Sequence, residues 1–325
     1  MAKAIRIHET GGPEVLRLED VPVGDPAAGQ ARVRHTAIGV NFIDTYHRSG
    51  LYKLPLPTGI GVEAAGVVES VGPDVTLVRP GDRVAYAASG APGAYAEARL
   101  LAADRLVQIP PGVSDAAAAA SFLKGMTVWM LVHRVHAVRP GEQVLFHAAA
   151  GGVGVLALQW LKAIGARVMA TVGSDEKAAL ARSLGAEAVV VYTREDFARR
   201  ARDWTGGEGV PVVYDSVGKT TFERSLDSLR PAGLMVSYGN ASGAVPPFEI
   251  AQLAAKGSLF LTRPTLFTYV ARREALEEGA RALFEMIGSG KVKVQPPRTY
   301  PLADAARAHR DLQGRVTTGS LVLVP

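Results

Sequence analysis

The residues that could do chemistry begin with a run of small side chains, Ala149-Ala150-Gly151-Gly152-Val153-Gly154. A short apolar stretch precedes the run and an apolar stretch of helical length follows it, so the pattern predicts strand, tight turn and helix. Small residues let a backbone approach a pyrophosphate, and a helix N-terminus offers unpaired N–H groups to that anion. Although Ala149 replaces the first glycine of the strict fingerprint, the run predicts dinucleotide binding.

The next predicted strand ends at Thr171-Val172-Gly173, where an NAD site usually carries an acid for the ribose 2′-hydroxyl. No acid stands there. A cation and two hydroxyl groups follow instead, from Lys177, Ser174 and Tyr192, and such groups could hold a 2′-phosphate. The pattern therefore favours NADPH over NADH. The alternative is that Lys177 is an ordinary solvated lysine on a helix surface.

A second polar group, Asn41-Phe42-Ile43-Asp44-Thr45-Tyr46, follows a predicted strand at residues 30–38. A zinc site would need three or four His, Cys or carboxylate ligands, but the chain has no cysteine, and His35 and His47 are isolated. The pattern therefore predicts a site without a metal. Asp44 either orients a neighbouring group or is a local turn residue.

Composition sets the broad class of the protein. A chain of 325 residues is long for one hydrophobic core, so two domains are expected. The formal charge of +5 comes from scattered residues and suits a phosphorylated ligand, while nucleic-acid binding is not expected without a platform of basic and aromatic side chains. The N-terminus lacks a signal-like apolar core and no long apolar run predicts a membrane span, so a cytoplasmic protein is expected.

The elements that must position these groups fall into three segments: residues 1–125 are β-rich, 126–262 alternate strand and helix, and 263–325 carry no nucleotide motif. The alternation predicts a doubly wound α/β domain, with the last segment returning to the first domain. The predicted strands are Gln143–His147, Ala166–Val172, Ala188–Val191, Val210–Asp215 and Leu234–Tyr238. The predicted helices are Ala116–Ala120, Thr127–Val138, Val153–Ile164, Asp175–Ser183, Glu195–Trp204, Thr221–Leu229, Arg272–Ile287 and Ala303–Leu312.

Over essentially its full length the chain resembles the zinc-independent quinone oxidoreductases of the medium-chain dehydrogenase/reductase superfamily. The segments that carry the resemblance are Asn41–Tyr46, Gly61–Gly66, Ser121–Thr127, His147–Gly154 with Gln159 and Lys162, Val213–Gly218, and Gly319-Ser320. Zinc alcohol dehydrogenases of the superfamily would have His where Val62 stands and Cys near Asn41. The missing ligands agree with the metal-free branch.

The resemblance implies a GroES-like β-rich catalytic domain, a Rossmann domain, NADPH as cofactor and a quinone as substrate. It also implies a homodimer in which Rossmann sheets pair edge to edge, and Ser258–Thr262 is the stretch expected at that edge.

Site residues are also implied by the resemblance. Asn41, Asp44, Tyr46 and Arg263 would line the quinone pocket, with Asn41 orienting nicotinamide or quinone and with Tyr46 or Arg263 stabilising the quinone oxygen. Asp44 is expected to orient a partner, because an ionised carboxylate would oppose a forming oxyanion. The cofactor would contact Ala150, Gly151, Gly152, Val153, Gly154, Gly173, Ser174, Lys177, Tyr192, Tyr238, Asn240, Ser242 and Arg315.

Two other functions compete with quinone reduction. An NADPH-dependent alkenal or enone reductase on the same fold would need a proton at the α-carbon, so an acid such as Tyr46 would matter more. A nucleotide-binding protein that binds RNA or serves as a structural crystallin is supported only by the basic charge.

Overall fold

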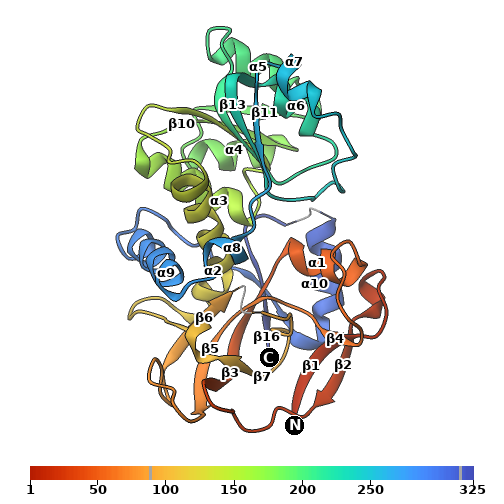
Figure 1. Ribbon diagram of the computed structural model, residues 1–325, viewed down its shortest axis with the longest axis vertical. Coiled ribbons are helices and arrows are strands. Elements are labelled where there is room, and N and C mark those ends of the chain that lie inside the picture. The colour runs from red at the N-terminus through yellow and green to blue at the C-terminus, as the bar shows by residue number, and fades with distance from the viewer. Residues whose placement is uncertain (88–89, 315–316) are drawn as a thin grey trace. The chain divides into compact units, whose positions relative to one another are not determined.

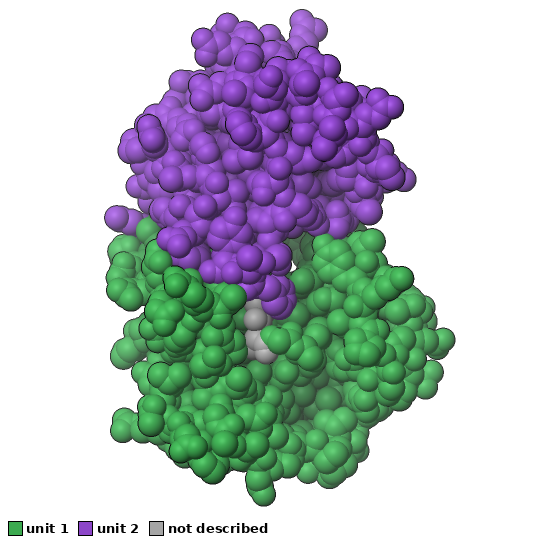
Figure 2. Space-filling model, in the orientation of Figure 1, with its two compact units in different colours: residues 1–126, 270–289, 294–325 green, residues 127–269, 290–293 purple. Residues whose placement is uncertain are grey.

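A computed structural model describes residues 1–87, 90–314 and 317–325 (Figure 1). The chain forms two compact units, coloured separately in Figure 2. Unit 1 comprises Met1–Met126, Val270–Ser289 and Val294–Pro325, and unit 2 comprises Thr127–Tyr269 and Gly290–Lys293. Residues 263–269 and 290–293 belong to unit 2, although the sequence pattern assigns them to the last segment, 263–325.

Unit 1 is rich in β-structure. One sheet has the order β2-β1-β4, and a larger one has the order β15-β16-β3-β5-β6-β8, with β7 also paired to β3. The strands are β1 Ala2–Ile7, β2 Arg17–Val21, β3 Gln30–Val40, β4 Thr58–Gly59, β5 Glu63–Val71, β6 Arg83–Ala87, β7 Ala98–Ala102, β8 Val107–Gln108, β15 Arg298–Pro301 and β16 Leu321–Val324. Alternation along β3 buries Ala31, Val33 and His35, as the period-two pattern predicts.

The helices of unit 1 are α1 Phe42–Ser49, α9 Arg273–Gly288, α10 Ala305–Gln313 and most of α2 Asp115–Trp129, with 3-10 turns at Pro13–Val15, Ala103–Arg105 and Leu302–Asp304. The two helices predicted at 116–120 and 127–138 are wrong as separate elements, because α2 continues through Gly125 and then passes into a π-helix, η3 Met130–Val135. A Cβ on Gly125 would lie 2.3 Å from a methyl carbon of Leu283, so this glycine admits α9 rather than ending α2.

Unit 2 contains a fully parallel sheet with the strand order β11-β10-β9-β12-β13-β14. Its strands are β9 Gln143–Phe146, β10 Arg167–Val172, β11 Ala188–Val191, β12 Val210–Asp215, β13 Leu229–Ser237 and β14 Phe260–Thr262. Its helices are α3 Gly152–Ile164, α4 Asp175–Ser183, α5 Phe197–Trp204, α6 Phe222–Asp227, α7 Ala251–Ala255 and α8 Leu266–Tyr269. Because the chain moves outward from β9 to β11 and then returns to β12 beside β9, the predicted doubly wound α/β fold is confirmed.

One boundary in this unit was predicted wrongly. The helix expected to reach Leu229 ends at Asp227, and β13 starts at Leu229 rather than Leu234. The register between β12 and β13 shifts within Val210–Val212, and Ala232 has a positive φ of 56°. The irregular pairing hides the early start of β13 from a simple hydrophobic pattern.

The stretch Asp115–Val135 is long and apolar enough to span a membrane, but 78% of its most apolar window is buried inside the protein. Ala118, Phe122 and Met126 on α2 have no exposed surface. This burial is what a core helix shows, and α2 carries the residues that meet the polar groups described next.

Candidate active site

The small-residue turn of unit 2 lies at the carboxyl edge of the parallel sheet, beside the point where strand order reverses. The N–H of Gly151 donates to the Ala148 carbonyl at 2.9 Å, and the N–H of Ala149 donates to Thr171 on β10 at 3.1 Å. The left-handed residue of the turn is Ala148, with a φ of 52°. Helix α3 begins directly after the exposed Gly151, so its first N–H groups suit an anion at this edge.

The glycines of the turn have different tasks. A Cβ on Gly154 would lie 2.5 Å from the carbonyl oxygens of both Ala148 and Ala149, and backbone at that distance cannot move aside cheaply. Gly154 therefore permits close packing of α3 on the turn. A Cβ on Gly151 would have only the Ala148 oxygen nearby, at 3.2 Å. This exposed glycine is the one that leaves room for a ligand.

The residues expected around a 2′-phosphate lie together after β10. Ser174 is the N-cap of α4, and its hydroxyl accepts a hydrogen bond from the N–H of Lys177 at 3.4 Å. A Cβ on Gly173 would lie 3.2 Å from the Tyr192 hydroxyl oxygen, so Tyr192 reaches the start of α4. Unit 2 therefore brings Gly173, Ser174, Lys177 and Tyr192 to one place.

Sequence analysis missed a cation at this place. Arg194 donates through Nη1 to Asp175 Oδ2 at 2.7 Å and through Nη2 to Asp175 Oδ1, and both side chains are exposed. Their hydrogen bond lowers the pKa of Asp175 and raises the pKa of Arg194. The pair offsets the Asp175 charge, one of the two acidic charges in the first turn of α4, where Glu176 follows it. The two residues are 19 apart in sequence, so no local motif announces the pair.

The loop after β13 is bonded to the loop after β12. The N–H of Tyr238 donates to the Asp215 carbonyl at 2.8 Å. The hydroxyl of Ser242 donates to the Val217 carbonyl at 2.8 Å and accepts from the N–H of Thr220 at 3.1 Å. Tyr238, Asn240 and Ser242 therefore lie at the same sheet edge as the small-residue turn, while Arg315 lies outside the described residues.

Arg263 follows β14 and also binds this edge. Its Nη1 donates to the Ser237 carbonyl at 3.0 Å, to the Ser237 hydroxyl at 3.2 Å and to the Gly239 carbonyl at 3.0 Å. These contacts hold a guanidinium group at the carboxyl end of β13, and in that position it stabilises the loop that begins at Tyr238.

In unit 1, Asn41 is fixed by a buried carboxylate. Asn41 Nδ2 donates to Glu63 Oε2 at 2.8 Å, and Glu63 also accepts from the N–H of Leu123 at 2.6 Å and lies 3.5 Å from Lys124 Nζ. Because a carboxylate only accepts, the contact assigns the amide nitrogen of Asn41 to Glu63 and leaves the amide oxygen on the other side. A Cβ on Gly39 would lie 2.2 Å from Glu63 Oε2, so Gly39 makes room for this arrangement.

Asp44 and Tyr46 lie on α1, a helix that sequence analysis did not predict. Its signals were present: Asn41 at the N-cap with Asp44 three residues later, and Gly50 after the last turn with a φ of 79°. Asp44 Oδ2 accepts from the N–H of Asn41 at 2.8 Å. The Tyr46 ring is nearly buried and packs edge-on against the Tyr52 ring with centroids 5.3 Å apart.

Asp44 also meets residues that sequence analysis did not include. The Tyr95 hydroxyl donates to Asp44 Oδ2 at 2.9 Å and lies 3.0 Å from His309 Nε2, and Arg48 Nη1 lies 3.1 Å from His309 Nδ1. Burial is the main cause that raises the pKa of Asp44 to about 7 and lowers the pKa of His309 to about 3. Unit 1 thus holds a titratable carboxyl group beside Asn41.

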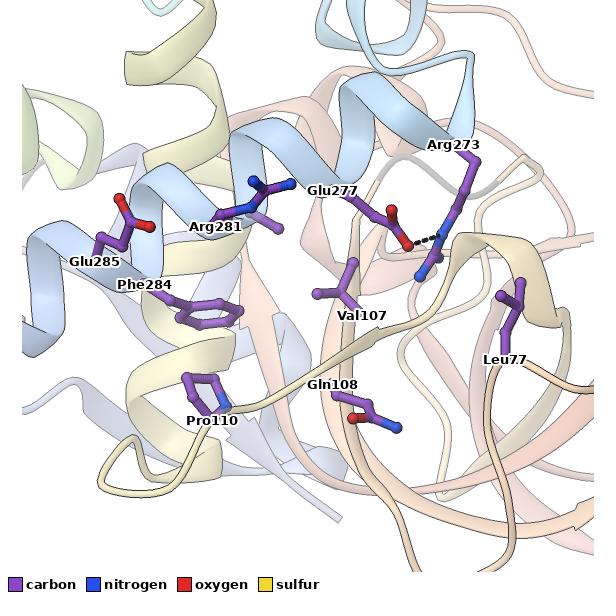
Figure 3. A pocket seen from close by; sticks show the side chains of 10 residues that line it. Leu77, Val107, Gln108, Pro110, Arg273, Glu277, Arg281, Phe284 and Glu285 are labelled. Atoms are coloured by element: carbon purple, nitrogen blue, oxygen red, sulfur yellow. Dashed lines mark hydrogen bonds and ion pairs between the residues drawn. The ribbon is translucent and has the colours of Figure 1, made fainter.

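Possible metal ligands and the groove in unit 1 also bear on the site. Among residues 1–87, 90–314 and 317–325, no group of three or more His, Asp or Glu side chains is placed to hold a metal. A groove of about 560 Å³ in unit 1 lies along α9, with Phe284 and Pro110 on its wall and the Arg273–Glu277 ion pair at 2.8 Å along one side (Figure 3). None of the expected site residues that the structure describes lines this groove.

Comparison with family profiles matches residues 27–111 to the alcohol dehydrogenase GroES-like domain and residues 152–285 to a domain described as zinc-binding dehydrogenase. The matched ranges fall in the β-rich unit and, for the most part, in the parallel-sheet unit. The predicted architecture of a GroES-like domain with a Rossmann domain is confirmed.

Individual relatives match over the whole chain. Quinone oxidoreductase 1 of Escherichia coli K12 is 51% identical over 100% of both chains. A crystal structure of E. coli quinone oxidoreductase complexed with NADPH has 50% identity, covers 100% of both chains and superposes with a TM-score of 0.98. A 2-haloacrylate reductase from a Burkholderia species is 46% identical over 100% of this chain and 99% of its own.

Proposed function

Because the chain belongs to the quinone oxidoreductase family, we propose that it catalyses NADPH-dependent reduction of quinones, without a metal. The observation that carries this proposal is the turn after β9, where the exposed Gly151 opens the N-terminus of α3 at the switch point of a parallel sheet. The E. coli structure with NADPH, which shares the fold and half the sequence, supports the choice of cofactor.

The residues present fit NADPH. Ala150 to Gly154 would hold the pyrophosphate on the N-terminal N–H groups of α3, where Gly154 leaves no side chain between helix and turn. Gly173, Ser174, Lys177 and Tyr192 would surround the 2′-phosphate, with Arg194 neutralising Asp175. Tyr238, Asn240 and Ser242 would meet the nicotinamide half, and Arg315 would approach from the tail. When bound, NADPH supplies the hydride.

The residues expected around the quinone would orient the acceptor. With its amide nitrogen held by Glu63, Asn41 presents its oxygen and its second N–H in a fixed direction, which suits hydrogen bonding to a carboxamide or a quinone oxygen. Tyr46 or Arg263 would donate to the quinone oxygen as negative charge develops there. The hydroxyl groups of a reduced quinone are acidic, so the reaction does not require a strong general acid.

A second candidate function is reduction of an activated carbon–carbon double bond. It is favoured by the 46% identical relative named 2-haloacrylate reductase. That reaction needs a proton delivered to carbon, so a group such as Tyr46 would act as an acid.

One experiment separates the two functions. Oxidation of NADPH and of NADH is followed with a naphthoquinone, a simple enone and a 2-haloacrylate, and the same sample is analysed for bound metal. The proposal expects quinone turnover, a preference for NADPH and activity that survives a chelator. If the protein does not reduce the quinone but reduces the enone or the haloacrylate, the second function is correct and the first is wrong.

Assembly and location complete the proposal. Strand β14 is the edge strand of the parallel sheet, and its Phe260 side chain is 62% exposed. An exposed aromatic residue on an unpaired edge supports a homodimer formed through that edge. A cytoplasmic location suits a chain without cysteine.

A further inference from the structure

Four side chains of unit 1 form an unbroken line of hydrogen bonds behind the proposed quinone site. Arg48 on α1 contacts His309 on α10 at 3.1 Å, His309 contacts the Tyr95 hydroxyl at 3.0 Å, and Tyr95 contacts Asp44 at 2.9 Å. All four have at most 2% of their surface exposed. The two helices lie side by side (Figure 1), so the line joins the tail of the chain to the N-terminal turn of α1.

The chemistry of the donors fixes the direction of every bond. Arginine only donates, so His309 Nδ1 must accept and its proton sits on Nε2. Nε2–H then donates to the Tyr95 oxygen, and the Tyr95 hydroxyl donates to Asp44 Oδ2. Because Arg48 occupies the second nitrogen of His309, the line cannot pass a proton to solvent through that nitrogen. Every hydrogen bond of the line is therefore donated in the direction of Asp44.

We propose that Tyr95 and His309 are positioning residues that set the pH at which Asp44 loses its proton, and through Asp44 the pH at which quinone reduction declines. The inference rests on the proposed function, because it places Asp44 beside the reacting quinone. Neither Tyr95 nor His309 touches substrate in this account, and both act through the carboxyl group.

The surroundings of Asp44 make its charge sensitive to this line. Oδ2 accepts from the N–H of Asn41 and from Tyr95, while Oδ1 is buried and has no partner among the described side chains and backbone. Burial raises the pKa of Asp44 most, the two hydrogen bonds lower it, Glu63 on β5 raises it and Lys124 on α2 lowers it. Losing the Tyr95 hydroxyl removes a donor that favours the ionised form, so the carboxyl holds its proton to higher pH.

The charge of Asp44 affects the reaction in one direction. A quinone that receives hydride becomes an oxyanion, and an ionised carboxylate nearby opposes that charge. Turnover should therefore be fastest with Asp44 neutral and should fall as Asp44 ionises. The decline of activity at alkaline pH then reports the ionisation of Asp44, which Tyr95 and His309 control.

The test compares Tyr95→Phe with wild type in quinone kcat/KM from pH 5.5 to 9.5 at saturating NADPH. The alkaline limb of Tyr95→Phe should move up by roughly one pH unit, since a hydrogen bond to a charged group is lost. At one pH unit above the wild-type midpoint, each protein's activity is divided by its own maximum. This fraction should be about five-fold larger for the variant than for wild type. A residue that served only packing would not raise relative activity at alkaline pH.

The chain offers a matched control. Tyr86 is also fully buried in unit 1 and its hydroxyl lies 3.0 Å from His35 Nε2, with ring centroids 5.6 Å apart against 5.7 Å for Tyr95 and His309. Tyr86→Phe loses the same kind of tyrosine–histidine contact without touching Asp44, so its alkaline limb should match wild type. His309→Leu keeps the Tyr95 donor and removes only the group that polarises it, so the limb should shift in the same direction as in Tyr95→Phe but by less. His309→Gln, whose amide can both accept and donate, should restore the wild-type limb.

A readout without turnover keeps the two proposals separate. Carboxyl carbon NMR of protein labelled at aspartate, with the Asp44 signal assigned by Asp44→Asn, gives the titration midpoint directly in folded protein. The midpoint should rise in Tyr95→Phe and stay unchanged in Tyr86→Phe. An unchanged or lowered Asp44 midpoint in Tyr95→Phe overturns this inference even if wild type reduces quinones. A wild type that reduces no quinone overturns the proposed function, whatever the NMR midpoint.

Discussion

Asp44 couples folding to pH because its carboxyl group is fully buried. Its pKa rises from 3.8 to about 7, with desolvation as the main cause. The folded chain therefore binds this proton more tightly than the unfolded chain does. The resulting stabilisation is complete below about pH 4 and is lost as the pH rises through 7.

We expect Asp44→Asn to abolish this loss of stability. Between pH 5 and pH 8 the free energy of unfolding of the variant should gain on wild type by up to about 3 kcal/mol. Urea unfolding at both pH values measures the difference. Asp25→Asn, at an exposed position of the same unit, should follow wild type. Parallel pH dependence of Asp44→Asn and wild type would show that Asp44 ionises normally.

Lys177 is the residue proposed to set the preference for NADPH over NADH. It stands in the first turn of α4, where Ser174 caps the helix and Arg194 neutralises Asp175. We expect Lys177→Ala to weaken NADPH binding roughly ten-fold or more and NADH binding little. The reason is that Lys177 would make its charge-assisted hydrogen bond to the 2′-phosphate, which NADH lacks. Arg182→Ala at the far end of α4 is the control, and cofactor fluorescence titration gives both Kd values. Equal losses for the two cofactors would contradict the assignment.

At the scale of elements, the turn and α3 depend on Gly154. A Cβ there would lie 2.5 Å from two backbone oxygens, so Gly154→Ala must shift either α3 or the turn. We expect a loss of about 1–3 kcal/mol in unfolding free energy together with weaker NADPH binding. Gly288→Ala, at the end of α9 with no atom within 4 Å of the added carbon, should leave NADPH binding unchanged and should not lower the unfolding free energy. Full NADPH affinity in Gly154→Ala would show that the turn tolerates the carbon.

Elements also show why part of this molecule can be predicted from sequence and part cannot. The strand, turn and helix around Gly151 are contiguous, so their pattern predicts the doubly wound fold and the turn that we propose holds the phosphates. Gly125 lies inside α2 and leaves room there for Leu283, which lies far along the chain. Asp44 and His309 are likewise brought together only by packing of α1 on α10. A row of hydrogen-bonded side chains from distant segments has no local sequence motif from which it could be predicted.

Close approaches of distant segments explain the glycines at positions 39 and 61. A Cβ on Gly61 would lie 2.3 Å from the Tyr95 ring, and one on Gly39 would lie 2.2 Å from Glu63. Each glycine makes room for a polar side chain that supports Asp44 or Asn41. Only the fold shows which side chain occupies the space beside each glycine.

At the scale of the whole molecule, each unit has its own hydrophobic core, and unit 2 also presents an unpaired sheet edge. Edge strand β14 pairs with β13 on one side, and its Phe260 is 62% exposed. An exposed, apolar edge invites pairing with another strand, so a second copy of the chain is the proposed occupant.

We expect Phe260→Asp to convert the proposed dimer into a monomer, because a buried, unpaired carboxylate at a two-fold interface would meet its own copy or lie close to it. Analytical ultracentrifugation over a range of concentrations measures the change. Leu18→Asp provides the control, since Leu18 is 43% exposed on β2, the edge strand of a sheet in unit 1. That variant should sediment as wild type does. If Phe260→Asp remains dimeric with wild-type affinity, the β14 edge is not the interface, and a monomeric wild type would remove the need for one.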